Sequence, residues 1–275
     1  MPCSDSDYAY LRELVLTQSA NFIDPSRNTL FETRLTPLAR FAGAVDVQGL
    51  VSILRNDEPA HLRRAVAEAM TINETSFFRD IKPFDALRDN ALPRLIEQNR
   101  SQRKLRIWSA ACSTGQEAYS VAMMIEEYFP ELATWDVKII GTDISRQVVE
   151  YARKARYRRI EVNRGLRARQ LLKHFQRDGE EWELCPKIRA MCEFKVVNLC
   201  APLPLLPIFD IVLLRNVLLY FPQQDRSLVF SDVHRQISPR GYLLLGNAEQ
   251  AEDSTNLFVP EFGPDWYHYR PVSTS

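Results

Sequence analysis

The stretch from Leu105 to Tyr119 constrains the fold more than any other part of the sequence. It begins with an apolar run typical of a strand, passes through small residues, and continues into a run whose apolar residues recur at helical spacing. Ser113 and Thr114 are good helix N-caps, so we expect the helix to begin there. A strand, a tight turn and a helix form the first unit of a doubly wound α/β domain, in which ligands bind at the carboxyl ends of the strands.

The turn in this stretch limits the kind of ligand. Gly115 is its only glycine, and neither the dinucleotide pattern G-x-G-x-x-G nor the P-loop pattern occurs. Glu117 follows instead, and an acid there would repel a diphosphate but suit a cationic or amine-bearing ligand. Alternatively, Glu117 only complements the dipole of the helix. The sequence leaves both interpretations open.

Composition excludes several classes of protein. The chain has 275 residues and a formal net charge of zero, so no overall field draws it to nucleic acid or membrane. It has no apolar run of membrane-spanning length, and its N-terminus has no signal-peptide layout. The five cysteines are odd in number and form no C-x-x-C pair, and the four histidines are scattered, so we expect reduced thiols in a cytoplasm and no metal site.

Residues 8–70 read as a series of helices with breaks at Asp24–Pro25, Gly43 and Glu58–Pro59. These helices predict a small helical domain. One polar side carries arginines, namely Arg27, Arg34 and Arg40. This side is either an ordinary solvated face or a docking surface for an acidic partner.

The segment Thr71–Asp80 follows no clean period. It combines polar residues with the adjacent aromatics Phe77 and Phe78 and with Arg79. The aromatics predict an anchor between two domains, and the polar residues predict a lid over a ligand. Both interpretations can hold together. A connecting helix is expected over Lys82–Arg100.

Polar groups recur where the predicted strands end. The strand Trp135–Gly141 leads to Asp143, which is either a ribose ligand or the N-cap of a helix over 144–155. The strand Cys192–Leu199 contains Asn198 near its end, and the apolar strand Phe209–Leu214 precedes Asn216. Together with Glu117, these groups predict one hydrogen-bonding ligand with a nucleoside part.

The rest of the sheet domain is less regular. Residues 157–191 are expected to leave the sheet, and the arginine-rich run Arg153–Arg169 is a candidate phosphate-binding patch. We expect a helix over Asp225–Ile237, a turn at Pro239–Gly241 and a strand over Tyr242–Leu245. Phe258 and Trp266–Tyr269 are expected to add antiparallel edge strands.

Several strings resemble the chemotaxis receptor methyltransferases, the CheR family. They are TINETSFFR at 71–79, WSAACSTGQEAYS at 108–120, GTDI at 141–144, VNL at 197–199 and RNVLLYF at 215–221. The resemblance implies esterification of glutamate side chains on the cytoplasmic helices of chemoreceptors, with S-adenosyl-L-methionine as cofactor and S-adenosyl-L-homocysteine as product. It also implies a helical receptor-docking domain over 1–72 and a linker with a cofactor lid over 73–104. A Rossmann-like methyltransferase domain over 105–275, with a small β-subdomain inserted at about 157–192, completes the implied architecture.

The resemblance also assigns roles to residues. Arg79 and Tyr220 match the residues nearest the transferring methyl group, and Arg34 and Arg40 match receptor-facing arginines. The cofactor-binding matches are Asn73, Thr75, Arg79, Glu117, Asp143, Asn198, Leu199, Arg215 and Asn216. The chain departs from the family at Gln116 and Ala118, where glutamate and proline are usual, and neither change removes a cofactor ligand.

The excursion at 176–191 is short, with Gly179 as its only glycine, which resembles members that do not bind a receptor's C-terminal pentapeptide. We further expect a monomer that neither binds nucleic acid nor inserts into a membrane.

The absence of a catalytic histidine or cysteine constellation agrees with this chemistry. A glutamate carboxylate is already ionised at neutral pH, so the reaction needs alignment and a dry site rather than a strong base. Phe77, Phe78, Tyr220 and Phe221 are candidates for an aromatic wall. The alternatives are an RNA or small-molecule methyltransferase, with the arginine run as its phosphate track, and a non-catalytic scaffold that senses the cofactor.

Overall fold

The computed structural model describes residues 3–57, 60–251, 256–263 and 267–272. The chain divides into two compact units. We call residues 1–72 with 220–225 the helical unit, and residues 73–219 with 226–275 the sheet unit. The segment 220–225, expected in the methyltransferase domain, therefore clusters with the helical unit.

The helical unit is built from α1 (Asp5–Ser19), η1 (Pro25–Arg27), α2 (Thr29–Phe41), α3 (Val47–Asp57) and α4 (Ala60–Met70). A capping box starts α1, because Ser4 accepts from the Asp7 N–H while the Asp7 carboxylate accepts from the Ser4 N–H. Leu11, Phe31 and Leu50 are fully buried in its core, which is separate from the core of the sheet unit. The break expected at Glu58–Pro59 lies outside the described residues.

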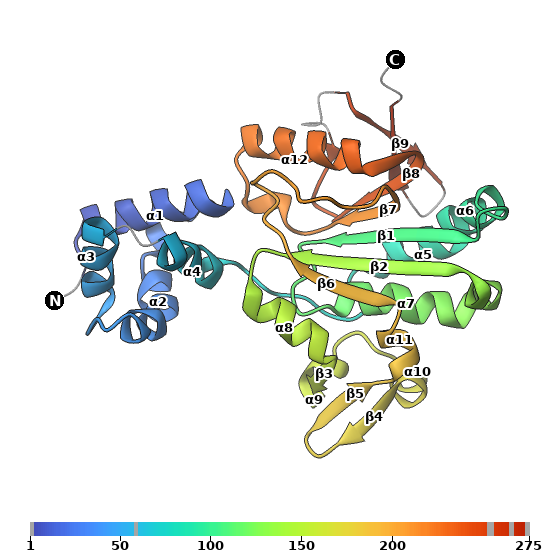
Figure 1. Cartoon of the computed structure of the whole chain (residues 1–275), viewed down its shortest axis with the longest axis horizontal. Helices are drawn as coiled ribbons and strands as arrows, with labels where there is room; N and C mark the ends of the chain where they lie inside the picture. The colour runs from blue at the N-terminus through green and yellow to red at the C-terminus, as the bar shows by residue number, and fades with distance from the viewer. Residues whose placement is uncertain (1–2, 58–59, 252–255, 264–266, 273–275) are drawn as a thin grey trace. The chain divides into compact units, whose positions relative to one another are not determined.

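The sheet unit contains a large sheet, seven-stranded in the part of the chain that the structure describes, with the order β6-β2-β1-β7-β8-β10-β9 (Figure 1). Its strands are β1 (Lys104–Ala110), β2 (Asp136–Asp143), β6 (Cys192–Val196), β7 (Phe209–Leu214), β8 (Ile237–Leu245), β9 (Phe258–Phe262) and β10 (Tyr267–Pro271). The pairs from β6 to β8 are parallel, and β10 is antiparallel to both of its neighbours. This is a doubly wound α/β sheet with antiparallel edge strands, as the sequence predicts; Trp266 lies outside the described residues.

Helices alternate with the parallel strands. They are α5 (Ile81–Ala86), the π-helical η2 (Leu87–Ala91), α6 (Leu92–Gln98), α7 (Gln116–Tyr128), η3 (Pro130–Thr134), α8 (Arg146–Lys154), η4 (Leu218–Tyr220) and α12 (Gln223–Gln236). The helix expected over 82–100 is thus present, with a π-helical turn in its middle. α7 and α8 pack against β2 and β6, and their apolar residues join one core with those of the strands.

A small sheet is inserted between α8 and β6. β3 (Arg156–Arg158), β5 (Glu181–Leu184) and β4 (Phe175–Asp178) pair antiparallel in that spatial order. The short helices α9 (Arg159–Val162), α10 (Ala168–His174) and α11 (Pro186–Arg189) complete the insertion. Figure 1 shows it set apart from the large sheet, below α7 and α8 in that view.

Two local predictions are wrong. Ser113 and Thr114 do not cap α7: the N-cap is Gly115 with φ +91°, because the preceding turn is already left-handed at Ala111 and Ser113. Residues 239–241 belong to β8 rather than to a free turn. The pairing with β7 jumps there from Phe209–Ile237 to Ile211–Tyr242, so the irregularity lies inside the strand.

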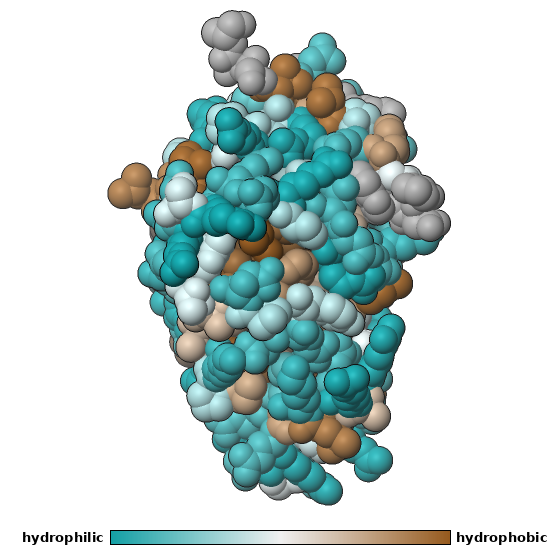
Figure 2. All heavy atoms as spheres, turned by 90° about the vertical axis from the view of Figure 1, so that its right-hand side faces the viewer, coloured by the Kyte–Doolittle hydropathy of each residue, from teal (hydrophilic) through white to brown (hydrophobic). Residues whose placement is uncertain are grey.

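One face of the molecule is largely hydrophilic. Figure 2 shows one face on which hydrophilic side chains predominate and apolar ones gather in small, separate patches. Among the helices that the structure describes, none has the length and apolar character needed to cross a membrane.

Candidate active site

Left-handed backbone gathers at the carboxyl ends of the central strands and in the segment before α5. A positive φ is uncommon outside glycine and costs on the order of 1 kcal/mol, so such clusters mark constrained sites. The residues concerned are Phe78 (+48°), Asp80 (+54°), Ala111 (+56°), Ser113 (+51°), Gly115 (+91°) and Asn216 (+59°). The turns after β1 and β7 therefore expose tightly bent backbone where an α/β sheet binds its ligand.

Glu117, in the first turn of α7, is held by two partners. Ser109 Oγ donates to its Oε1 at 2.7 Å, and Arg215 Nη1 donates to its Oε2 at 2.9 Å. The Glu117 side chain keeps 13% of its surface exposed, whereas the Arg215 side chain keeps 1%. Glu117 is thus more than a dipole complement, because a buried arginine after β7 fixes its carboxylate.

Arg215 also reaches the segment before α5. Its Nη2 donates to the backbone oxygen of Arg79 at 2.8 Å and lies 3.4 Å from Asp80 Oδ2. Its guanidinium lies 5.5 Å from the centre of the Phe84 ring. One arginine between two carboxylates leaves this cluster with a net negative charge, which fits a cationic ligand and disfavours a polyphosphate.

Asp143, at the tip of β2, joins two neighbouring loops. Its Oδ2 accepts from the Ser113 N–H at 2.9 Å, and its Oδ1 accepts from the Ser145 N–H at 3.0 Å. The N-cap of α8 is Ser145, so Asp143 does not occupy that position. A carboxylate has about four acceptor directions, so the group that holds these loops also suits the hydroxyls of a ribose.

Glu249 is a buried acid that the sequence did not reveal. Its Oε1 accepts from the N–H groups of Val217 and Leu218, and its Oε2 accepts from those of Asn216 and Gly246, at 2.6–2.8 Å. Three of these charge-assisted bonds hold the loop after β7 in shape, including left-handed Asn216, and the fourth binds Gly246 just after β8. Glu249 follows β8 in a stretch without a recognisable pattern, so only the fold brings it to this loop.

The segment 73–80 is bound to the sheet unit at several points. Ser113 Oγ donates to the Asn73 backbone oxygen at 2.8 Å, and the Phe78 N–H donates to Ser120 Oγ at 2.9 Å. Arg79 Nη1 donates to the Glu74 backbone oxygen at 2.9 Å, and Thr75 is half-buried. The segment therefore lies against the turn after β1, as a lid over that turn would.

Phe77 does not belong to an aromatic wall. It is fully buried, with its ring 5.1 Å from that of Tyr157 and 5.5 Å from that of Phe175. Both partners come from the small inserted sheet, so Phe77 anchors the segment 73–80 to the insertion. Phe78 is half-buried and packs on Phe84 with the ring centres 5.2 Å apart.

The other predicted site residues belong to both units. Asn198 follows β6 and its Oδ1 accepts from the Cys200 N–H at 3.0 Å, while Leu199 is buried. Tyr220 clusters with the helical unit, in which Arg34 and Arg40 also lie. Arg40 is exposed on α2. The sheet unit thus brings together Glu117, Asp143, Arg215, Asn216 and the backbone of 73–80.

The cysteines do not form a nucleophilic centre. Burial is the main cause that raises the pKa values of the Cys112 and Cys192 thiols, so both stay neutral. No cluster of potential metal ligands occurs among the described residues.

Most of the arginine-rich run 153–169 is engaged within the protein. Arg156 pairs with Asp178 and Glu181, Arg158 with Glu161, and Arg164 with Glu74. Arg153 donates to the Phe194 carbonyl through Nε and Nη2. These bonds favour a structural role for the run over a phosphate track.

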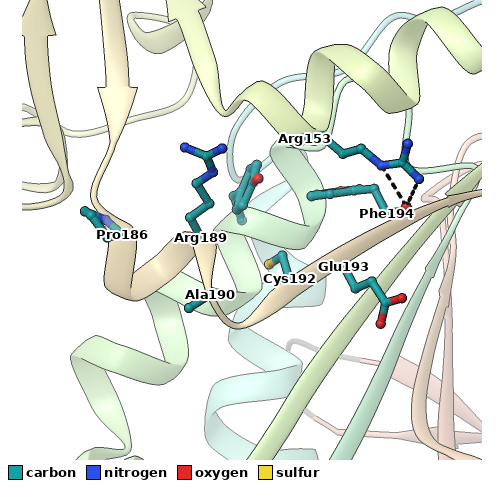
Figure 3. Close-up of a pocket in the computed structure, with 8 residues that line it drawn as sticks. Arg153, Pro186, Arg189, Ala190, Cys192, Glu193 and Phe194 are labelled. Atoms are coloured by element: carbon teal, nitrogen blue, oxygen red, sulfur yellow. Dashed lines mark hydrogen bonds between the residues drawn. The ribbon is translucent and has the colours of Figure 1, made fainter.

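A separate pocket of about 680 Å³ lies beside edge strand β6 (Figure 3). Figure 3 shows Arg153 across the carbonyl of Phe194, with Arg189 and Pro186 on α11. Its lining, in the part of the chain that the structure describes, includes none of the predicted cofactor residues. This pocket is therefore distinct from the strand ends, where the predicted cofactor residues of the sheet unit lie.

Comparison with known proteins identifies the family. The family model described as "CheR methyltransferase, SAM binding domain" matches residues 73–264. "Chemotaxis protein methyltransferase 1" of Pseudomonas aeruginosa is 35% identical over 254 residues, which cover 90% of this chain and 92% of that protein. "Chemotaxis protein methyltransferase Cher2" of Pseudomonas putida is 34% identical, with coverage of 90% and 92%, and "Chemotaxis protein methyltransferase" of Vibrio parahaemolyticus is 35% identical, with coverage of 93% of each chain.

The match covers most of the sheet unit, including the turn after β1, Asp143 and the loop after β7. The negatively charged cluster around Glu117 fits the positively charged cofactor that the family model names. The chain therefore belongs to the CheR methyltransferase family, the S-adenosylmethionine-dependent methyltransferases of chemotaxis.

Proposed function

We propose that this protein methylates glutamate side chains on the cytoplasmic helices of chemoreceptors, forming methyl esters during adaptation in the cytoplasm. The observation that carries the proposal is the net negative cluster of Glu117, Asp80 and Arg215 at the strand ends, in a chain with chemotaxis methyltransferases as relatives. This cluster suits a sulfonium donor. A receptor glutamate is the acceptor that the relatives' names favour.

We assign the cofactor to the strand ends. Glu117 would meet the amine of the methionine part and Asp143 the ribose hydroxyls. The Arg215 side chain is almost fully buried, so Arg215 would act by fixing the positions of Glu117 and the lid relative to one another. The lid positions Asn73, Thr75 and Arg79 and the loop positions Asn198, Leu199 and Asn216 complete this assignment.

The acceptor needs no proton removed. S-adenosylmethionine, when bound, supplies a methyl group on a sulfonium, which is an activated leaving group. The substrate carboxylate is ionised at neutral pH, so the protein's part is to align it and exclude water. Tyr220 would donate a hydrogen bond to one carboxylate oxygen and leave the other to react. Arg79 would orient the same carboxylate, although a tight ion pair would lower its nucleophilicity.

We assign receptor docking to α2. Arg40 is exposed there, whereas Arg34 is half-buried and donates to the backbone oxygens of Met70 and Thr71 at 3.0 and 2.7 Å. Arg40 is therefore the better candidate for contact with an acidic receptor helix. Arg40→Glu should raise the KM for a receptor fragment, while the same charge reversal at exposed Arg100 should not.

The short β4–β5 hairpin supports pentapeptide independence. Its turn is formed by Gly179 and Glu180 alone, which leaves little room for the glycine-rich loop of pentapeptide-binding members. We expect equal methylation of receptor fragments with and without their C-terminal tail.

Transfer of labelled methyl groups to a receptor cytoplasmic fragment tests the proposal. The wild-type protein should label glutamates as base-labile esters, and Tyr220→Phe should bind the cofactor normally but turn over at least about tenfold more slowly. Tyr128→Phe, at an exposed site on α7, is the control. No labelling by the wild type would refute the proposed acceptor, and full turnover by Tyr220→Phe would remove Tyr220 from the mechanism.

A further inference from the structure

The backbone of Tyr220 is held by the helical unit. The Phe22 N–H donates to the Tyr220 carbonyl oxygen at 2.9 Å. Phe22 lies in the loop 20–24 between α1 and η1, and its side chain is 58% exposed. This hydrogen bond joins two backbone groups, so the Phe22 ring can be changed without removing it.

The loop that carries Phe22 is itself fixed. Ala20 ends α1 in a left-handed conformation with φ +50°, and Asn21 is buried with its Nδ2 donating to the Met70 backbone oxygen at 3.0 Å. The same oxygen accepts from Arg34 Nη1 at 3.0 Å. The last turn of α4, α2 and the loop are thus joined at one carbonyl.

Tyr220 also shares a cavity with these residues. The cavity measures about 40 Å³ and is lined by the loop, by Leu30 and Arg34 of α2, by Met70 and by Tyr220. A single water needs roughly 10–15 Å³ measured in this way, so the cavity has space for only a few waters. Tyr220 and the loop 20–24 therefore line the same small cavity within the helical unit.

We propose that the loop 20–24 positions Tyr220 for methyl transfer, through the Phe22 N–H directly and through Asn21 as the anchor of the loop. This inference rests on the proposed function, in which Tyr220 aligns the substrate carboxylate. Asn21 and Phe22 touch neither cofactor nor substrate in this scheme; they are positioning residues. The unit that we assign to receptor docking thereby also fixes a residue of the reaction.

The loop offers a matched pair of substitutions. Phe22→Pro removes the N–H, whereas Phe22→Ala keeps it and removes only the exposed ring. A hydrogen bond of this kind contributes about 0.5–1.5 kcal/mol, which corresponds to a roughly two- to tenfold change in rate. We expect Phe22→Pro to lower kcat by that factor, with the Kd for S-adenosylmethionine unchanged, and Phe22→Ala to lower kcat much less.

Proline also restricts the residue before it, so Phe22→Pro can disturb the loop more widely. Asn21→Ala supplies an independent test, because it removes the anchor at Met70 and leaves every backbone N–H in place. Its kcat should fall by a smaller factor, again at constant cofactor Kd. Circular dichroism and urea unfolding establish that each variant is folded before kcat is compared.

A double-mutant cycle distinguishes loss of Tyr220 positioning from a general disturbance of the structure. If the loop acts through the Tyr220 hydroxyl, Phe22→Pro and Asn21→Ala should have no further effect on kcat in the Tyr220→Phe background. Full additivity, or a kcat of Phe22→Pro equal to that of Phe22→Ala, would overturn the inference. Failure of the proposed function gives a different result, since the wild type would then not label the receptor fragment at all.

Discussion

Gly165→Ala provides a direct test of how the lid segment is seated. Gly165 has φ +100°, and a Cβ built on it would lie 1.8 Å from the backbone oxygen of Phe77. Real Cβ atoms essentially never approach another atom closer than 3.0 Å, so a shift is unavoidable. The buried ring of Phe77, fixed between Tyr157 and Phe175, resists that shift.

The size of the effect follows from two contributions. Alanine in a left-handed conformation costs roughly 1–2 kcal/mol, and overpacking of a well-packed site costs about 1–3 kcal/mol more. Gly179→Ala is the matched control, because Gly179 also has a positive φ, +62°, but a Cβ there meets no atom within 4 Å. The two variants should therefore differ by at least about 1–3 kcal/mol, because Gly165→Ala adds the contact with Phe77 and a φ of +100°, which lies outside the left-handed region that Gly179 occupies.

Urea unfolding and calorimetric titration with S-adenosylmethionine measure this difference together. If the lid stays in place, Gly165→Ala lowers the free energy of unfolding below that of Gly179→Ala. If the lid moves away instead, stability is spared and cofactor affinity falls, by tenfold for each ~1.4 kcal/mol. Equal stability and equal affinity of the two variants would refute the seating of the lid on Gly165.

Three further perturbations test the buried polar groups. Arg215→Met leaves Glu117 without its cationic partner and should lower the free energy of unfolding in urea by about 3–5 kcal/mol. The control Arg235→Met, at an exposed arginine, should lower it by about 0.5 kcal/mol or less, and equal losses of stability in the two variants would contradict the role of the Arg215–Glu117 pair. Glu249→Gln weakens four bonds to backbone and should cost about 1–3 kcal/mol in the same assay, so an unchanged unfolding midpoint would count against it. Burial lowers the pKa of His268, so the unfolded chain takes up the proton before the folded protein as the pH falls. The free energy of unfolding should therefore decline below about pH 6.5, and His268→Gln should remove this pH dependence in urea titrations from pH 5 to 8.

The parallel sheet was predictable because its strands are buried on both faces. Such strands read as continuous apolar runs, and the range predicted from the sequence, Phe209–Leu214, coincides with β7. Glu117 and Asp143 were also predictable as residues of the ligand edge, since each follows directly on a strand or its turn. Their roles toward the cofactor remain predictions.

Long-range contacts lay beyond the sequence. The hydrogen bond from Arg215 to the Arg79 carbonyl spans more than half of the sheet unit's sequence. Glu249 accepts hydrogen bonds from a loop that lies about thirty residues earlier in the chain. The start of α7 was misplaced because side-chain preference at Ser113 and Thr114 carried less weight than the left-handed turn before Gly115. Local sequence patterns predict the helices and strands, whereas the roles of Arg215 and Glu249 depend on which loops the fold brings into contact.

The helical unit is discontinuous in sequence, and this bears on how such proteins can be recombined. A chimera that replaced only residues 1–72 with those of a relative would leave the native segment 220–225 facing a foreign loop. Substitutions in the two stretches therefore have to match one another. A domain exchange that keeps this interface native must carry both pieces of chain, although about 150 residues of the other unit separate them.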